Sequence, residues 1–332
     1  MKKIIACISM MFLVCGCAQI AKPSTMQMFC MDTVMDIQIY GENKDEALHS
    51  VSDELYRIEA LLDRKSNESD IYKLNNRKEA ETETVKLLEK LLKVSEKTDG
   101  AFDITVTPVM DLWGFYDKNY NVPESEEIEN ALKSVDYRNV VINGNKISLL
   151  NNAKLDMGGV GKGYASDKAA HILKKYEIKS AMLNLGGNVY AHGRRSDGKL
   201  WRVGVANPFD ANGKEALTIE VEDKAVVTSG GYRRYFEENG KEYHHIINPA
   251  TGYPAESDIK SVTVISESGT YADAYSTAFF VMGREKAVDF LETSDIDAVI
   301  VCNDKTVYFT DTISEKIHIS DGFYGKEIDK NL

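Results

Sequence analysis

The stretch Lys154–Tyr164, KLDMGGVGKGY, places four glycines and a lysine between an expected strand and an expected helix. Glycine lets backbone N–H groups approach a ligand closely, and the first turn of a helix attracts anions. Lys162 adds a full positive charge to this loop. The pattern favours a bound anion such as a phosphate. The alternative is a tight strand-to-helix turn that needs glycine only for its geometry.

The two common nucleotide-binding motifs do not fit this loop. A Walker A loop requires glycine where Asp156 stands and a hydroxyl residue where Gly163 stands. The dinucleotide motif GxGxxG requires glycine where Tyr164 stands. The loop therefore predicts an anion site of a different kind.

Two adjacent histidines, His244 and His245, stand immediately before the run IINPATGYP. A histidine at the end of a strand can act as a general base near neutral pH. Adjacent side chains on a strand point to opposite faces, so only one of the two can face a given site. The alternative is that both are ordinary polar residues.

Asp273 and Thr277 lie four residues apart in the run YADAYSTA, which predicts the start of a helix. Side chains at this spacing share one helical face. A carboxylate and a hydroxyl are hard oxygen ligands of the kind that Mg²⁺ prefers. The alternative is that Asp273 caps the helix and Thr277 packs in the core.

The N-terminal sequence MKKIIACISMMFLVCGC has a basic start, an apolar run and small residues before a cysteine. This pattern is typical of a bacterial lipoprotein signal segment over residues 1–16, with Cys17 as the lipidated first residue. The apolar run is shorter than the roughly 20 residues of a membrane-spanning helix. We expect a protein held by lipid on the extracytoplasmic face of the cell membrane, with a tether over 17–27 and one domain over 28–332.

The whole chain of 332 residues has 43% hydrophobic residues, a net charge of −12 and five cysteines. Its acidic balance argues against nucleic acid as a partner. After removal of the signal segment only Cys17, Cys30 and Cys302 remain, too few for a disulfide framework or a cysteine-rich zinc site. Because the protein is acidic, a polyanionic ligand would have to be stabilised by a metal ion or by backbone N–H groups at its binding site.

The elements that must position these residues alternate between helical and strand patterns without a regular βαβ repeat. The chain has no low-complexity segment or linker that would divide it. We predict an α+β fold, a single large domain built around β-sheets with flanking helices. Strands are expected at 28–40, 140–142, 146–150, 180–185, 201–206, 217–221, 225–228, 261–265 and 298–302, and helices at 45–62, 84–97 and 165–176.

Taken together, these motifs resemble the ApbE family, the FAD:protein FMN transferases. The resemblance is spread over nearly the whole mature chain, and the number and order of its motifs make it specific. The matching stretches are MDT at 31–33, SDIYKLN at 69–75, GAFDIT at 100–105, LWGF at 112–115, DMGGVGKGYA at 156–165, LGGN at 185–188, TSGGYRR at 228–234, HIINPATG at 245–252, and ADAYSTA at 272–278.

The resemblance implies an α+β fold that binds FAD with Mg²⁺, cleaves its pyrophosphate and transfers FMN to a Ser or Thr of another protein, releasing AMP. Acceptors in this family are typically membrane-associated redox subunits outside the cytoplasm. Carried over to this sequence, the resemblance assigns the metal to Asp273 and Thr277 with backbone oxygens near Gly161 and Ser276, FAD contacts to Met31, Ala101, Phe102, Asp103, Lys162, Tyr164 and Ile246, and the catalytic base to His245.

Two positions depart from the family pattern. The usual Met-Gly-Thr is Met31-Asp32-Thr33 here, which predicts a loss of backbone freedom at Asp32. Lys65 stands where many members carry an aromatic residue against a ring of the ligand. Two other functions use the same residues, a Mg²⁺-dependent FAD pyrophosphatase that yields FMN and AMP, and a non-catalytic FAD-binding lipoprotein.

Overall fold

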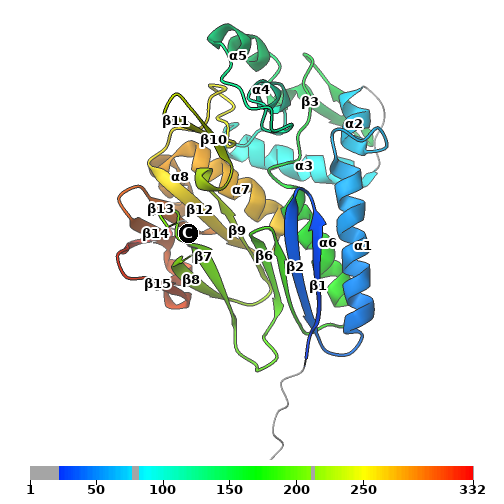
Figure 1. Ribbon diagram of the computed structural model, residues 1–332, viewed down its shortest axis with the longest axis vertical. Helices are drawn as coiled ribbons and strands as arrows, with labels where there is room; N and C mark the ends of the chain where they lie inside the picture. The colour runs from blue at the N-terminus through cyan, green and yellow to red at the C-terminus, as the bar shows by residue number, and fades with distance from the viewer. Residues whose placement is uncertain (1–21, 77–81, 211–213, 332) are drawn as a thin grey trace, which may run out of the picture.

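The computed structural model describes residues 22–76, 82–210 and 214–331 (Figure 1). Its centre is a nine-stranded sheet in the order β1-β2-β5-β6-β9-β12-β13-β14-β16. Neighbouring strands of this sheet are antiparallel in every described pair except β14 with β16. The strands are β1 (Ser24–Cys30), β2 (Thr33–Tyr40), β5 (Ser180–Leu185), β6 (Asn188–Gly193), β9 (Lys224–Ser229), β12 (Ile259–Ser266), β13 (Asp297–Cys302), β14 (Thr306–Thr310) and β16 (Tyr324–Ile328).

One face of the large sheet packs against helices, and the amphipathic spacing of those helices explains the arrangement. Helix α1 buries a stripe that includes Leu48, Val51 and Leu55, and strand β2 buries Met35 and Ile37 toward the same core. The helices are α1 (Lys44–Leu62), α2 (Asp70–Asn75), α3 (Thr82–Lys97), α4 (Thr107–Leu112), α5 (Ser125–Leu132), α6 (Gly161–Lys175), α7 (Gly269–Met282) and α8 (Arg284–Glu292).

The other face of the large sheet is only partly covered. A three-stranded sheet in the order β15-β8-β7 packs on it through a second core that includes Val203, Ile219 and Val299. These strands are β7 (Trp201–Ala206), β8 (Glu215–Val221) and β15 (Ile317–Ile319). The first two strands of the large sheet lie beyond this cover, and Phe29 on β1 and Val34 on β2 are 64% and 49% exposed.

A third, smaller core joins α4 and α5 to the hairpin of β10 (Tyr235–Glu238) and β11 (Lys241–His244) at the top of Figure 1. Its central ring is Trp113, which packs near Phe236, Tyr243 and Tyr253. A further hairpin consists of β3 (Val140–Asn143) and β4 (Lys146–Leu149). Within the described residues, no helix is both long enough and apolar enough to cross a bilayer.

The predicted α+β fold, a single domain built around β-sheets with flanking helices, is confirmed. The helices expected at 45–62 and 84–97 are α1 and α3, and the hairpin expected around Asn143-Gly144-Asn145 is β3 and β4. The helix expected at 165–176 begins earlier, at Gly161, so the glycine loop runs directly into its first turn.

The start of the domain differs from the prediction. The single strand expected over 28–40 is wrong, because the chain turns at Met31 and Asp32 and forms the β1–β2 hairpin. Residues 24–27, which the sequence assigns to the tether, belong to β1. Residues 1–21 lie outside the described part, so the signal segment and lipidation at Cys17 stay predictions.

The β1–β2 turn generates a prediction about stability. Met31 and Asp32 both have left-handed backbone angles, with φ of 51° and 58°. This conformation costs an L-residue roughly 1–2 kcal/mol, and glycine adopts it freely at a smaller entropic cost. We expect Asp32→Gly to raise the free energy of unfolding by up to about 1 kcal/mol in chemical denaturation. Val34→Gly, in the adjacent strand, should lower it, and a loss of stability in Asp32→Gly would contradict this reading of the turn.

Candidate active site

The site is built where helices α6 and α7 cross with their backbones in contact. A β-carbon added at Gly163 of α6 would lie 2.2 Å from the carbonyl oxygen of Gly269 and 2.7 Å from the β-carbon of Asp273. A β-carbon at Gly269 would lie 2.0 Å from the hydroxyl oxygen of Ser166. Only glycine allows so close an approach at these two positions. The crossing therefore holds the start of α6 against the side chains of α7.

An aspartate on α6 fixes the register of this crossing. Asp167 accepts hydrogen bonds from the backbone N–H groups of Gly269 at 2.6 Å and Thr270 at 3.1 Å, and from the hydroxyls of Ser268 and Thr270 at 2.9 and 2.6 Å. These groups form the first turn of α7, whose N–H groups have no partner within the helix. Asp167 thus caps α7 from the neighbouring helix, a role that sequence reasoning missed.

The candidate metal ligands face the glycine loop. A carboxylate oxygen of Asp273, Oδ2, accepts from the backbone N–H of Gly163 at 2.9 Å. One turn along α7, the hydroxyl oxygen of Thr277 lies 3.9 Å from the place that a β-carbon on Gly159 would occupy. The structure therefore brings Asp273, Thr277 and the loop together, as the sequence predicts.

Hydroxyl groups extend this cluster to strand β9. Ser229 Oγ lies 2.8 Å from Ser276 Oγ and 3.2 Å from Thr277 Oγ1. The hydroxyls of Ser276 and Thr277 also donate to the backbone oxygen of Asp273, at 3.0 and 3.3 Å. Sequence reasoning quoted Ser229 in a motif but gave it no role, because its contacts depend on the sheet order.

The donor set fits a hard cation. Burial raises the pKa of Asp273, and the charge of Lys162 and the N–H of Gly163 act in the opposite direction. A positive ion beside this carboxylate would favour its charged form further. Among the described residues there is no group of three or more His, Cys, Asp or Glu that could hold a metal ion. One carboxylate, one hydroxyl and backbone oxygens suit Mg²⁺, which usually keeps water and substrate phosphates as its other ligands.

Asp156 holds the front of the glycine loop in place. Its Oδ1 accepts from the backbone N–H of Gly158 at 2.6 Å, and its own N–H donates to the oxygen of Ile104 at 2.8 Å. Phe102 lies against the loop, with a ring carbon 3.7 Å from the position of a β-carbon on Gly159. The 100–105 segment and the glycine loop therefore form one wall of the site.

Met31 approaches the loop from the β1–β2 turn. Its sulfur lies 3.9 Å from the position of a β-carbon on Gly161. The backbone N–H of Met31 donates to Glu59 Oε1 of α1 at 2.6 Å, which ties the turn to the helix. Glu59 is a second residue that sequence reasoning missed, since this bond joins segments 28 positions apart.

Two of the predicted FAD contacts have side chains engaged in other interactions. The carboxylate of Asp103 accepts from the N–H and hydroxyl of Thr105, at 2.7 and 2.6 Å, and from the N–H of Tyr137 at 2.8 Å. The hydroxyl of Tyr164 donates to Glu83 of α3 at 2.6 Å. Their side-chain oxygens therefore stabilise the wall of the site. Ala101 is partly exposed beside Phe102, whereas Ile246 is buried in the main core.

His245 follows directly after strand β11 and has one ring nitrogen available as a base. Its Nδ1 lies 3.0 Å from the backbone oxygen of Arg234 and donates to it, which assigns the acceptor lone pair to Nε2. Burial lowers the pKa of His245 to about 4, and the charges of Arg234 and Lys162 act in the same direction. The ring is therefore neutral at pH 7, with no proton on Nε2.

The neighbouring His244 has a structural role. Its Nε2 donates to the oxygen of Ala255 at 3.2 Å, and its Nδ1 accepts from the N–H of Ile246 at 3.3 Å. Its ring meets Phe280 edge-on with centroids 5.5 Å apart. Both ring nitrogens of His244 therefore have protein partners. Strand β11 ends at His244, so the alternation expected for two adjacent strand residues does not apply to His245.

The ring of Tyr116 lies close to Lys65, the residue that replaces an aromatic side chain of the family pattern. The guanidinium of Arg64 lies 3.7 Å, and the ammonium of Lys65 4.6 Å, from the centroid of the Tyr116 ring. Both distances are within the range of cation–π contact. Lys65 also pairs with Asp117. Lys65, which stands at the family's aromatic position, therefore contacts the ring of Tyr116 instead of supplying a ring itself.

Comparisons with known proteins define the class. The ApbE family model matches residues 31–300 of this chain. The FAD:protein FMN transferase of Treponema pallidum is 31% identical over 315 residues, covering 87% of each chain. That of Klebsiella pneumoniae is 32% identical over 273 residues, covering 79% of this chain and 84% of its own. This chain therefore belongs to the ApbE family, and the expectation of an enzyme of the transferase class is confirmed.

Solved structures agree in fold. The ApbE protein of Thermotoga maritima superposes with a TM-score of 0.82 at 33% identity, covering 89% of this chain and 99% of its own. The flavinyl transferase ApbE of Pseudomonas stutzeri gives 0.80 at 27% identity, covering 89% and 97%. The resemblance to the ApbE family stated from the sequence is confirmed.

The helix crossing generates a prediction about the site. Gly163→Ala forces a methyl group into the backbone of α7, and such overpacking costs about 1–3 kcal/mol. We expect a clear drop in the melting temperature, measured by calorimetry. Gly161→Ala, two residues earlier, is the control because the nearest atom to its new methyl would be a methionine sulfur at an ordinary 3.9 Å. Equal melting temperatures for the two variants would show that the crossing is not tightly packed.

Proposed function

We propose that this chain is a Mg²⁺-dependent FAD:protein FMN transferase, which attaches FMN through a phosphoester bond to a Thr or Ser of an acceptor protein and releases AMP. One observation carries the proposal. A buried carboxylate and a hydroxyl of α7, Asp273 and Thr277, lie against the glycine-rich start of α6 in a chain whose relatives are named for this activity.

The substrate would bind through its diphosphate. The start of α6 offers a favourable helix dipole, and Lys162 supplies a positive charge. The backbone N–H groups of Gly161 and Gly163 already donate to the oxygen of Met157 and to Asp273. Asp273, Thr277 and the backbone oxygens of Gly161 and Ser276 would hold Mg²⁺. When bound, the ion would neutralise charge on the diphosphate oxygens. These groups together explain how a protein with net charge −12 can hold a polyanion.

The chemical step requires a general base that removes the proton of the acceptor hydroxyl. The acceptor hydroxyl attacks the phosphorus that carries the riboflavin, a new P–O bond forms, and the bond to the AMP phosphate breaks. AMP leaves as a weakly basic phosphate and needs no strong general acid. The hydroxyl proton passes to Nε2 of His245, whose Nδ1 proton is held by the Arg234 oxygen.

The place of action follows from the N-terminal sequence. We propose that lipid on Cys17 anchors the enzyme to the extracytoplasmic face of the cell membrane. The acceptor would then be a membrane redox subunit on the same side. The signal-like start MKKIIACISMMFLVCGC supports this part of the proposal.

His245 provides the test of the proposed reaction. General base catalysis typically contributes about 10²–10⁴-fold, so we expect His245→Ala to lose transfer by that factor while FAD affinity stays within about twofold. Covalent flavin on a Thr-containing acceptor is measured by mass spectrometry, and AMP by chromatography. His171→Ala, an exposed histidine of α6, serves as the control.

Each outcome separates the candidate functions. A transfer rate for His245→Ala within tenfold of wild type would remove the histidine from the mechanism. AMP release by wild type without covalent flavin would identify a FAD pyrophosphatase. FAD binding without AMP release under any metal condition would identify a binding protein.

A further inference from the structure

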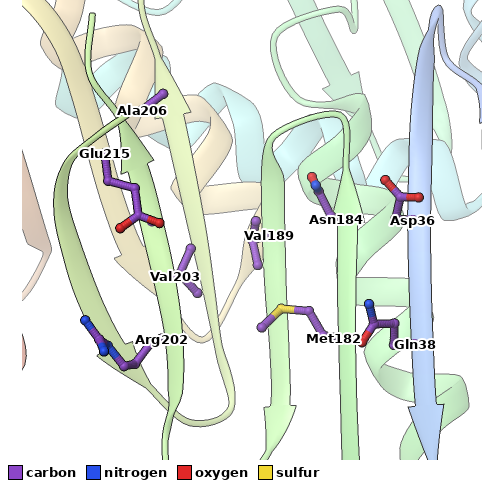
Figure 2. Close-up of a pocket in the computed structure, with 10 residues that line it drawn as sticks. Asp36, Gln38, Met182, Asn184, Val189, Arg202, Val203, Ala206 and Glu215 are labelled. Atoms are coloured by element: carbon purple, nitrogen blue, oxygen red, sulfur yellow. The ribbon is translucent and has the colours of Figure 1, made fainter. Parts of the chain in front are cut away.

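A groove of about 520 Å³ lies on the face of the large sheet that carries no helices, between the β7–β8 strands and strands β2, β5 and β6 (Figure 2). This volume is within the roughly 300–1,000 Å³ of ordinary ligand sites. Neither the metal ligands nor His245 line it. Its lining is mixed in character, with Asp36, Gln38, Asn184, Arg202 and Glu215 beside Met182, Val189, Val203, Gly204 and Ala206.

One wall of the groove is the edge of strand β7. Three consecutive residues, Arg202, Val203 and Gly204, all line it. Consecutive side chains of a strand point to opposite faces, so such a run lines one cavity only along the strand's edge. Within the described residues β7 pairs with β8 alone, which leaves its other edge with unpaired backbone N–H and C=O groups.

The floor of the groove is the uncovered face of β2 and β5. Asp36 is the register partner of Asn184, and Gln38 that of Met182. Val34 continues the same face of β2 toward the turn at Met31, with exposed Phe29 as its partner on β1. The floor therefore runs as a continuous surface from the groove to the turn that carries Met31.

The floor also reaches the candidate active site through the β5–β6 turn. Asn184 Oδ1 accepts from the backbone N–H of Gly187 at 2.8 Å, so a groove residue holds this turn. Asn188, which follows the turn, is buried, and its side chain lies near the carboxylate of Asp273. From Asp36 to Thr33 the distance along β2 is roughly 10 Å, about three residues of extended chain. The groove and the start of α6 lie on opposite faces of the sheet, so a segment in the groove would reach the site over the β1–β2 turn, where the Met31 sulfur lies 3.9 Å from the position of a β-carbon on Gly161.

We propose that this groove, defined by β7, β8 and the uncovered face of β2, β5 and β6, binds an extended segment of the acceptor protein beside the Thr or Ser that receives FMN. The inference rests on the proposed transferase function and assigns its acceptor surface. An unpaired strand edge binds an added strand through backbone hydrogen bonds, and pockets for alternate side chains give selectivity. An open groove with a free strand edge suits a polypeptide, and its floor runs on to the turn that carries Met31.

The test uses two groove variants of the full-length enzyme. Gly204→Phe places a ring in the wall next to Glu215, and Asp36→Arg reverses a charge on the floor. The acceptor source is the membrane fraction of cells from which this chain's gene has been deleted, incubated with FAD and Mg²⁺. Covalent flavin is quantified by fluorescence of denaturing gels at several membrane concentrations. FAD binding is measured separately by calorimetry.

We expect each variant to raise the half-saturating acceptor concentration at least about tenfold, the size expected for a central interface residue, with FAD affinity unchanged. Gly204→Ala is the matched control for the ring, because its β-carbon displaces the same Glu215 side chain without adding a ring. Glu327→Arg is the matched control for the charge, because Glu327 is exposed on β16 at the far edge of the same sheet. Both controls should transfer FMN as wild type does.

Three results would overturn the inference. Groove variants that transfer FMN as fast as the controls would show that the acceptor binds elsewhere. Variants that lose FAD affinity would make the groove part of the FAD site. Absence of covalent flavin with the wild-type enzyme would refute the transferase function itself, and this surface with it.

Discussion

The close contact of two helix backbones at Gly163 and Gly269 is the constraint on which the site depends. A single methyl group at either position would meet backbone or side-chain atoms within 2.2 Å. Because neither residue carries one, the start of α6 lies directly on Asp273, and Asp167 caps α7 in return. Asp273 of α7 thus accepts a hydrogen bond from the start of α6, and Asp167 of α6 accepts hydrogen bonds from the start of α7. Packing and hydrogen bonds therefore hold the glycine-rich start of α6 against Asp273 and Thr277 of α7.

The electrostatics of the site are consistent with the proposed binding of a metal and a diphosphate. Asp273 is almost fully buried, so its charged form needs a nearby positive charge. Lys162 supplies part of it, and Mg²⁺ would supply the rest. The same surroundings lower the pKa of His245, so that the ring stays neutral beside a cationic region. Under the proposed function, Lys162 and the metal would balance the diphosphate, and His245 would act as a neutral base.

Local spacing was enough to predict the parts of the site that lie within one element. The four-residue spacing of Asp273 and Thr277 predicts that they share one face of a helix. The glycines at 158–163 predict a tight loop at the start of a helix. The β1–β2 hairpin was missed because Met31 and Asp32 adopt left-handed angles without a glycine or asparagine to mark the turn. Asp167, Glu59 and Ser229 were missed because their partners are distant in sequence. The hydrogen bond from the Tyr164 hydroxyl to Glu83 of α3 was missed for the same reason, because the two residues are far apart in the sequence.

The central claim is that Mg²⁺ bound at Asp273 and the diphosphate of FAD stabilise each other. Calorimetric titration of FAD with and without Mg²⁺, on wild type and on Asp273→Asn, tests it most directly. The asparagine keeps the shape of the side chain and can still accept the Gly163 N–H, so the fold is retained. The account predicts that Mg²⁺ tightens FAD binding to wild type and that FAD tightens Mg²⁺ binding by the same factor, with both effects lost in the variant. Equal enhancement by Mg²⁺ in the two proteins would contradict it.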